Sequence, residues 1–217
     1  DIDNCDAKIF GGGNEADFYG TTRITFTQGK VGYIFGGGNN AHVYGNTIVE
    51  VLGGEVCNDV FGGGQNGGVY PYKSAGSPYG YTDGSFGGNT TVIIRSDCLK
   101  MNAGNTDFDK NADGVILPNR GTTPYYTSDN DASTVAKGLY ELAPSNYPDG
   151  VTNSVKVTGN VYGGSWGLDP AKAVDAKVVK DTKVYIQGNI EIGGNVYGGG
   201  NAGVVEGNTD VKIGECN

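Results

Sequence analysis

The sequence predicts an all-β protein, and within that class a right-handed parallel β-helix. Three observations indicate this fold. A glycine-rich phrase, Ile-Phe-Gly-Gly-Gly-Asn at residues 34–39, recurs in five copies, and the first three begin 25 and 26 residues apart. A short Thr-x-Val or Thr-x-Ile phrase follows each copy, and 40 glycines with a single methionine disfavour long helices. A fixed period of this length is typical of stacked repeats, which gives about five coils.

Equivalent residues of the copies form columns, because each strand of a parallel β-helix pairs with its equivalent one turn away, about 4.8 Å along the axis. The predicted inward aliphatic column is Ile9, Ile34, Val60, Val161 and Val196. The predicted aromatic ladder, on the opposite face, is Phe10, Phe35, Phe61, Tyr162 and Tyr197. The predicted amide column is Asn14, Asn39, Gln65 and Asn201, with Ser165 in the fourth copy. Stacked amides are expected to hydrogen-bond along their column.

The second copy predicts the order of elements within one coil. A short strand, a glycine corner, a second short strand and a turn precede a longer strand over residues 47–51. Alternation places Thr47, Val49 and Val51 inward and Ile48 and Glu50 outward. We therefore expect Ile48→Lys to cost little. The preference of parallel crossovers for one hand predicts a right-handed coil.

One domain is predicted over residues 1–217, with two insertions from the third coil. The first covers about residues 70–86 and is rich in Gly, Pro and Tyr, and the second covers about residues 96–150 and is polar. Insertions in repeat proteins leave the solenoid as loops, often on a binding face. The second insertion has enough apolar residues to fold as a small subdomain.

A net charge of −9 disfavours nucleic acid and anionic membranes as partners, and no run of residues reaches transmembrane length. The chain begins at Asp1 without a signal peptide, which is typical of a mature or excised segment. Both ends fall at the same phase of the repeat. Open coil ends recruit further strands, so we expect other chains or repeats to stack there, with a filament as one result.

The second insertion contains the beginning of a calcium loop. Asp109, Asn111 and Asp113 place oxygen ligands at alternate positions, and Gly114 follows them. The twelfth position, where such a loop requires a carboxylate, holds Arg120, so the match is half complete. A Ca²⁺ site and a solvated acidic turn both remain open.

Motifs that would indicate catalysis are explained by the repeat. Asn208-Thr209-Asp210 resembles a triplet of polygalacturonase-type β-helix hydrolases, but Asn46-Thr47 and Asn89-Thr90 occupy the same column without the acid. The lone His42 lies on the solvated side of a short strand. The arginines that a polysaccharide lyase would use are few, but the Asp-rich second insertion with Arg120 keeps a calcium-assisted lyase as the minority interpretation. No catalytic residue is therefore assigned.

Tyrosines concentrate in the two insertions. Their exposed rings combine apolar area with a hydroxyl, which suits the binding of a glycan or a protein. The candidate ligand-binding residues are Tyr70, Tyr72, Tyr79, Tyr81, Tyr125 and Tyr126. The alternative is that these rings pack the loops onto the coil.

Cysteine spacing predicts one disulfide. Cys57 and Cys98 leave the long strands of adjacent coils at similar corners, within disulfide reach. Cys5 and Cys57 lie at like corners two coils apart, about 10 Å, which is too far for a bond.

The repeated [IV]-[FY]-G-G-G-N phrase resembles adhesin-like bacterial cell-surface proteins built on glycine-rich parallel β-helix repeats. The resemblance covers the five coils and not the insertions. It implies a secreted or anchored extracellular protein with a structural or adhesive role, and it carries over no catalytic residue. The rival class is a carbohydrate-active enzyme, either a polysaccharide lyase or a glycoside hydrolase, on the same scaffold.

Overall fold

The computed structural model describes residues 3–72, 87–96, 154–172, 175–188 and 190–214. These residues form eighteen strands and no helix. Every ladder between two named strands is parallel, and the two antiparallel contacts are isolated bridges, Pro71 with Gly87 and Trp166 with Ala202. The predicted all-β class with parallel strands is therefore confirmed.

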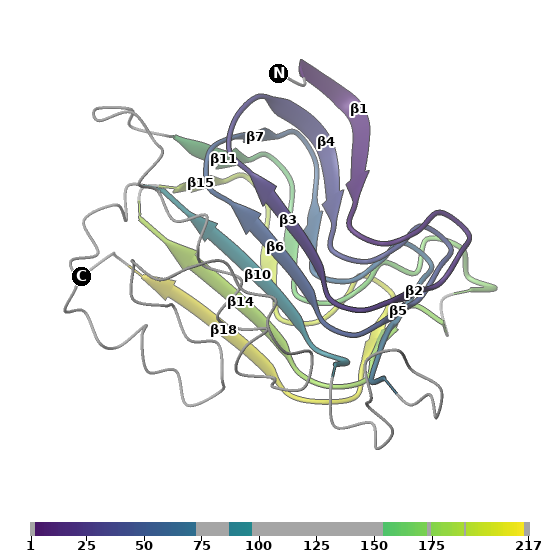
Figure 1. The fold of residues 1–217 in the computed structure, drawn as a ribbon. Coiled ribbons are helices and arrows are strands. Elements are labelled where there is room, and N and C mark those ends of the chain that lie inside the picture. Colours follow the sequence, from purple (N-terminus) through teal and green to yellow (C-terminus); the bar gives the residue numbers. More distant parts are fainter. Residues whose placement is uncertain (1–2, 73–86, 97–153, 173–174, 189, 215–217) are drawn as a thin grey trace, which may run out of the picture.

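The strands lie in three sheets (Figure 1). The first sheet holds, in spatial order, β15 (Ile190–Ile192), β11 (Val155–Val157), β7 (Gly54–Val56), β4 (Lys30–Phe35), β8 (Val60–Phe61), β12 (Val161–Tyr162) and β16 (Val196–Tyr197), with β1 (Asp3–Phe10) beside β4. The second holds β18 (Thr209–Gly214), β14 (Thr182–Gln187), β10 (Thr90–Arg95), β6 (Thr47–Val51) and β3 (Thr22–Phe26). The third holds β17 (Val204–Val205), β13 (Lys177–Val178), β9 (Val69–Tyr70), β5 (Val43–Tyr44) and β2 (Phe18–Tyr19).

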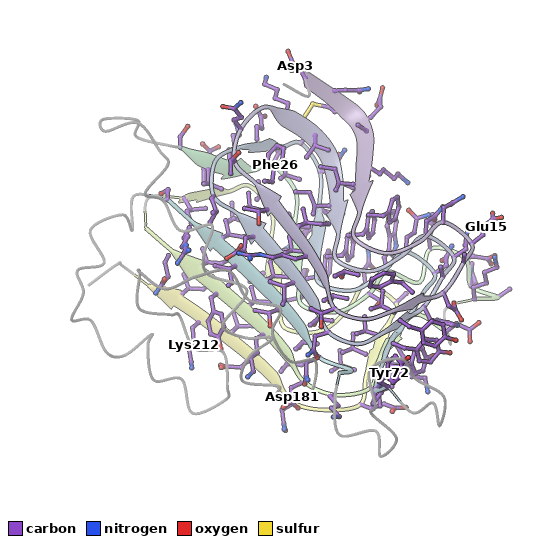
Figure 2. All side chains as sticks on the ribbon, viewed as in Figure 1. Asp3, Glu15, Phe26, Tyr72, Asp181 and Lys212 are labelled. Atoms are coloured by element: carbon purple, nitrogen blue, oxygen red, sulfur yellow. A yellow bond between two sulfur atoms is a disulfide. The ribbon has the colours of Figure 1, made fainter. Side chains whose placement is uncertain are left out.

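Equivalent repeat residues pair directly, so the columns predicted from the sequence are physical stacks. In the second sheet, for example, Val49 pairs with Ile24 on one side and with Val92 on the other. The inward aliphatic residues of the first and second sheets form one core cluster, in which Ile34, Val49 and Val92 are fully buried. Side chains fill the space that the sheets enclose (Figure 2).

The threonine that begins each strand of the second sheet points inward, as predicted for Thr47 and Thr90, which are fully buried. In four of these five strands, the threonine hydroxyl donates a hydrogen bond to a glycine carbonyl of the next copy. These pairs are Thr22 with Gly36, Thr47 with Gly62, Thr90 with Gly163, and Thr182 with Gly198. The column thus joins one glycine corner to the strand of the preceding copy.

The predicted aromatic ladder is also confirmed. Its rings stack with centroids 4.7–4.9 Å apart, from Phe10 to Tyr197. Phe35 and Phe61 are fully buried, because Tyr33 and Trp166 pack against them. The ladder is therefore a second apolar core and not a solvated face.

The amide column requires one correction. Asn39 donates a 2.7 Å side-chain hydrogen bond to Asn14, as expected. In the fourth copy, however, Trp166 and not Ser165 takes the amide position, since the backbone of Trp166 pairs with Gln65. Ser165 stands at the third glycine position, where its hydroxyl accepts a hydrogen bond from the Gly64 amide.

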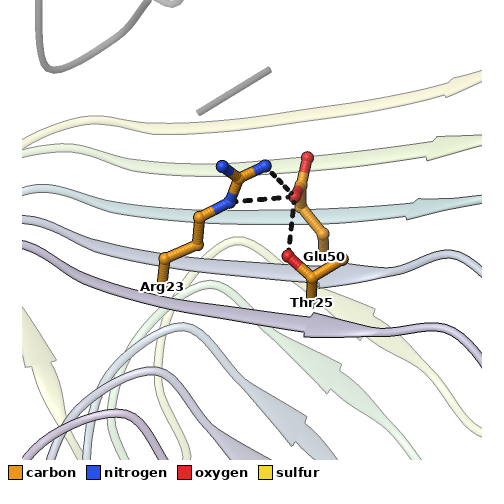
Figure 3. Close-up of polar contacts among 3 residues, drawn as sticks. All are labelled: Arg23, Thr25 and Glu50. Carbon is orange, nitrogen blue, oxygen red and sulfur yellow. Dashed lines mark hydrogen bonds and ion pairs between the residues drawn. The ribbon is translucent and has the colours of Figure 1, made fainter. Parts of the chain in front are cut away.

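The outer face of β6 was predicted to be solvated, and this is wrong. Ile48 is 5% exposed and Glu50 is 2% exposed. Arg23 covers Glu50, whose Oε2 accepts hydrogen bonds from Arg23 Nη2 at 2.7 Å and from Thr25 Oγ1 at 3.2 Å (Figure 3). Alternation shows which residues share a face but not whether the face is covered, so the expectation that Ile48→Lys costs little is withdrawn.

The disulfide was also assigned wrongly. Cys57 bonds to Cys5, with Cα atoms 5.5 Å apart, and not to Cys98, which lies outside the described residues. The register between β1 and β4 slips between Asn4 and Lys8, so β1 bulges over Gly32. A side chain on Gly32 would collide with the carbonyls of Cys5 and Ala7. An even coil spacing would separate Cys5 and Cys57 by about 10 Å, but the bulge brings Cys5 across the intervening strand to Cys57.

Candidate binding face

A row of three tyrosines lies on the third sheet. Tyr19, Tyr44 and Tyr70 come from β2, β5 and β9 and are direct register partners. Each strand is an apolar–tyrosine pair whose first residue lies on the opposite face of the sheet, so alternation turns the tyrosine outward. The ring centroids of Tyr19 and Tyr44 are 4.8 Å apart, and those of Tyr44 and Tyr70 are 5.6 Å apart. We refer to these three residues as the tyrosine row.

The rings of the row stack nearly parallel, with interplanar angles of 9° and 29°. Because each inner ring face is covered by its neighbour, the row offers ring edges and phenol hydroxyls to solvent. Tyr19 is 46% exposed, and Tyr44 and Tyr70 are partly buried. A ligand that follows the row would meet one phenol per coil.

His42 and Tyr72 support the row from its sides. The His42 ring lies edge-on to Tyr70 at 5.0 Å, and its Nδ1 accepts a 3.0 Å hydrogen bond from the Gly68 amide. The neutral imidazole therefore carries its proton on Nε2. The Tyr72 ring lies edge-on to the Tyr19 ring, with centroids 5.8 Å apart, and Tyr72 is 2% exposed. Tyr72 therefore packs against the row and does not offer a surface to a ligand.

Burial, together with nearby carboxylates, favours the neutral phenols of Tyr44 and Tyr70. Burial raises the pKa of Tyr44, and the nearby Asp17 carboxylate raises it further. Burial also raises the pKa of Tyr70. The nearby Lys177 ammonium lowers this pKa in part, and the Asp175 carboxylate raises it. Both hydroxyls consequently keep their protons at neutral pH and can donate hydrogen bonds.

Lys177 is the basic side chain near Tyr70 of the row. Its Nζ lies 2.9 Å from Glu206 Oε1, and this hydrogen bond raises the pKa of the ammonium. Acidic and basic groups with phenol donors form a surface suited to hydroxyl-rich ligands.

The structure describes some of the site residues predicted from the sequence and not others. Tyr70 belongs to the regular strand β9 and not to the first insertion. Tyr19 and Tyr44 were missed, although the dipeptides Phe-Tyr, Val-Tyr and Val-Tyr at residues 18, 43 and 69 repeat at the coil period. The candidates Tyr79, Tyr81, Tyr125, Tyr126, Asp109, Asn111 and Asp113 lie outside the described residues. Among the residues that are described, no three His, Cys, Asp or Glu side chains group closely enough to hold a metal ion.

The Asn208-Thr209-Asp210 triplet follows the repeat. Thr209 pairs with Thr182 in the threonine column, and Asn208 donates its backbone amide to Asp181 Oδ1 at 2.8 Å. Asp210 lies 3.2 Å from Lys212 on the same strand. Each residue thus has a position set by its column or its strand neighbour.

Comparisons of the chain with protein-family models, curated proteins and solved structures gave no match. Within the described part of the chain, no helix has the length and apolar character needed to cross a bilayer.

Proposed function

We propose that this chain is an extracellular structural or adhesive module whose tyrosine row binds a glycan. The observation that carries the proposal is the alignment of three outward phenols on consecutive strands of a parallel sheet. Strands hold binding groups more rigidly than loops do, so little ordering entropy is lost on binding. The scaffold in this proposal is a right-handed β-helix of five coils, supported by the five equivalent strands of the second sheet and by the crossover rule.

A linear glycan suits the row better than a flat apolar partner. The stacked rings present edges and hydroxyls along a line, and hydroxyl donors with nearby carboxylates match the hydroxyl groups of sugars. In this proposal an extended chain lies along the solenoid axis, with successive sugars beside Tyr19, Tyr44 and Tyr70. A protein ligand is the second candidate, favoured by the aromatic content of the face.

The proposed location is the surface of a bacterial cell. Structural disulfides persist mainly in oxidising compartments, and Cys5–Cys57 fastens the first strand here. The acidic charge and the resemblance to adhesin-like repeats are consistent with that location. Calcium binding at Asp109, Asn111 and Asp113 is also proposed. A calcium-dependent rise in melting temperature, lost in the Asp109→Ala/Asp113→Ala variant, would support it, and no rise in the parent would exclude it.

The test is a glycan array probed with the parent chain, the Tyr44→Ala variant and the Tyr197→Ala variant. Tyr197 is the control, because its ring is also stacked in a column of aromatic residues but belongs to the other aromatic ladder. We expect Tyr44→Ala to abolish the parent's glycan signals and Tyr197→Ala to keep them. Equal signals from both variants would place binding elsewhere.

The same experiment separates the rival functions. Each glycan that binds is incubated with the chain and examined for shortened products. Cleavage would establish the carbohydrate-active enzyme instead of the binding module. Absence of any glycan signal, with retention of a protein ligand by the parent but not by Tyr44→Ala, would favour the protein partner.

A further inference from the structure

The last coil exposes apolar side chains whose equivalents in the preceding coil are buried. Ile213 is 67% exposed and Val211 is 40% exposed, whereas their register partners Ile186 and Val184 are 5% and 0% exposed. Val204 and Tyr197 are 53% and 43% exposed on the same coil. We refer to the surface formed by β15, β16, β17 and β18 as the terminal face.

The longest strand of the terminal face offers a regular backbone edge. Strand β18 pairs in unbroken register with β14 over residues 209–214, and the described strands place nothing on its other side. A long, flat edge with apolar side chains is a template for pairing with another strand. The occupant must therefore bring both backbone partners and apolar side chains.

The charges on β18 match those of a second β18 that runs in the opposite direction. Asp210 and Lys212 flank Val211 on the outward side of the strand, with side chains 38% and 58% exposed. If Val211 of one copy lies opposite Val211 of another, each Asp210 faces a Lys212. Opposite charges across an antiparallel pair are favourable, and such reciprocal contacts define a two-fold interface.

The other end of the molecule fits the terminal face poorly. Asp3, Lys30, Glu55, Lys156 and Glu191 form one column of alternating charge, with ion pairs of 3.3 and 3.4 Å. A head-to-tail stack would place Glu191 of one copy against Asp3 of the next. The bulge in β1 would also interrupt pairing there, since bulged edges are poor templates.

We infer that the terminal face binds a second copy of this chain through antiparallel pairing of β18 with β18, which gives a closed two-fold dimer. Val211 lies at the centre of the interface, with Asp210 and Lys212 of each copy forming two ion pairs across it. The dimer does not involve the tyrosine row, because the row lies on β2, β5 and β9 and strand β13 separates these from β17 of the terminal face. Unlike a head-to-tail contact, it cannot extend into a filament.

Two charge variants test this pairing by light scattering on fractions from size exclusion over a concentration series. We expect the parent to reach twice the monomer mass and no more. Asp210→Lys gives each edge two basic residues, and Lys212→Asp gives it two acidic residues. Each variant alone should dissociate more readily, with Kd raised about tenfold or more, while an equimolar mixture should dimerise again.

A melting temperature equal to that of the parent, measured at low concentration, shows that both variants fold. Lys172→Asp is the charge control. Lys172 lies 3.4 Å from Asn40 in an exposed turn, so the same change there should leave the dimer intact. A mixture that stays monomeric would exclude the antiparallel pairing. A parent whose mass grows without limit would indicate head-to-tail stacking instead, and a parent that is monomeric at millimolar concentration would refute the interface.

Discussion

Strands β10 and β18 belong to the same sheet and carry the same alternation of inward aliphatic residues, but their surroundings differ. Strand β10 has a neighbour on each side, and its residues from Thr90 to Ile94 are buried. Strand β18 has one described neighbour, and five of its six residues are exposed. The repeat therefore determines which column a residue joins, while the coils above and below determine what that residue contributes to stability.

The largest difference between an inner coil and the last coil is expected at the glycine corners. A Cβ on Gly37 would lie 2.7 Å from the Gly64 nitrogen and 2.9 Å from the Gly64 Cα, whereas Gly199, in the same column, has nothing within 4 Å. Gly37→Val should cost more than about 4 kcal/mol or prevent folding, because backbone cannot move aside as a side chain can. Gly199→Val should cost below about 1 kcal/mol.

Chemical denaturation of both glycine variants, at concentrations where the chain is monomeric, measures this difference. Similar free energies of unfolding for the two variants would show that the corners are not tightly packed.

The next difference concerns two isoleucines of one inward column. Ile94 and Ile213 both align with Ile186, but Ile94 is fully buried and Ile213 is 67% exposed. Ile94→Ala should lower the free energy of unfolding by about 2–5 kcal/mol, through lost burial and a residual cavity. Ile213→Ala should change it by less than about 0.5 kcal/mol. A large loss from Ile213→Ala in the monomer would mean that another part of the chain covers the terminal face.

The two ends of the described structure also differ in covalent constraint, since the disulfide fastens β1. Cys5→Ser should cost about 2–4 kcal/mol, because the bond closes a loop of 52 residues in the unfolded chain. Cys98→Ser is the control and should leave the Cys5–Cys57 bond intact. Peptide mapping of the parent checks the pairing, and a Cys57–Cys98 peptide would contradict it.

These cases show what the sequence could and could not predict. Columns such as Thr22, Thr47 and Thr90 were predictable, because equivalent positions of a repeat must stack. The burial of Ile48 and Glu50 could not be predicted from alternation, and Glu50, for example, is covered by Arg23 of the neighbouring strand. The bulge at Cys5 could not be predicted for a similar reason, because its extra residues lie over Gly32, a glycine of the next coil.

In the candidate site, too, some residues could be predicted from the sequence and some contacts could not. The sequence marked Tyr70, and the coil period applied to the preceding Val-Tyr and Phe-Tyr pairs would have found Tyr44 and Tyr19. The burial of Tyr72 and the edge contact of His42 with Tyr70 could not be read from spacing, because both depend on side-chain packing between coils.

The smallest predicted difference concerns the threonine hydroxyls. Thr90 is fully buried and donates to the Gly163 carbonyl, whereas Thr209, its equivalent on β18, is exposed. Thr90→Val keeps much of the side-chain volume but leaves that carbonyl without the hydroxyl donor, a loss of about 1–3 kcal/mol. Thr209→Val should be nearly neutral in the monomer, because Thr209 is exposed and its hydroxyl can hydrogen-bond with water. Equal losses from both substitutions would show that volume and β propensity, and not the hydrogen bond to the next coil, determine the role of this column.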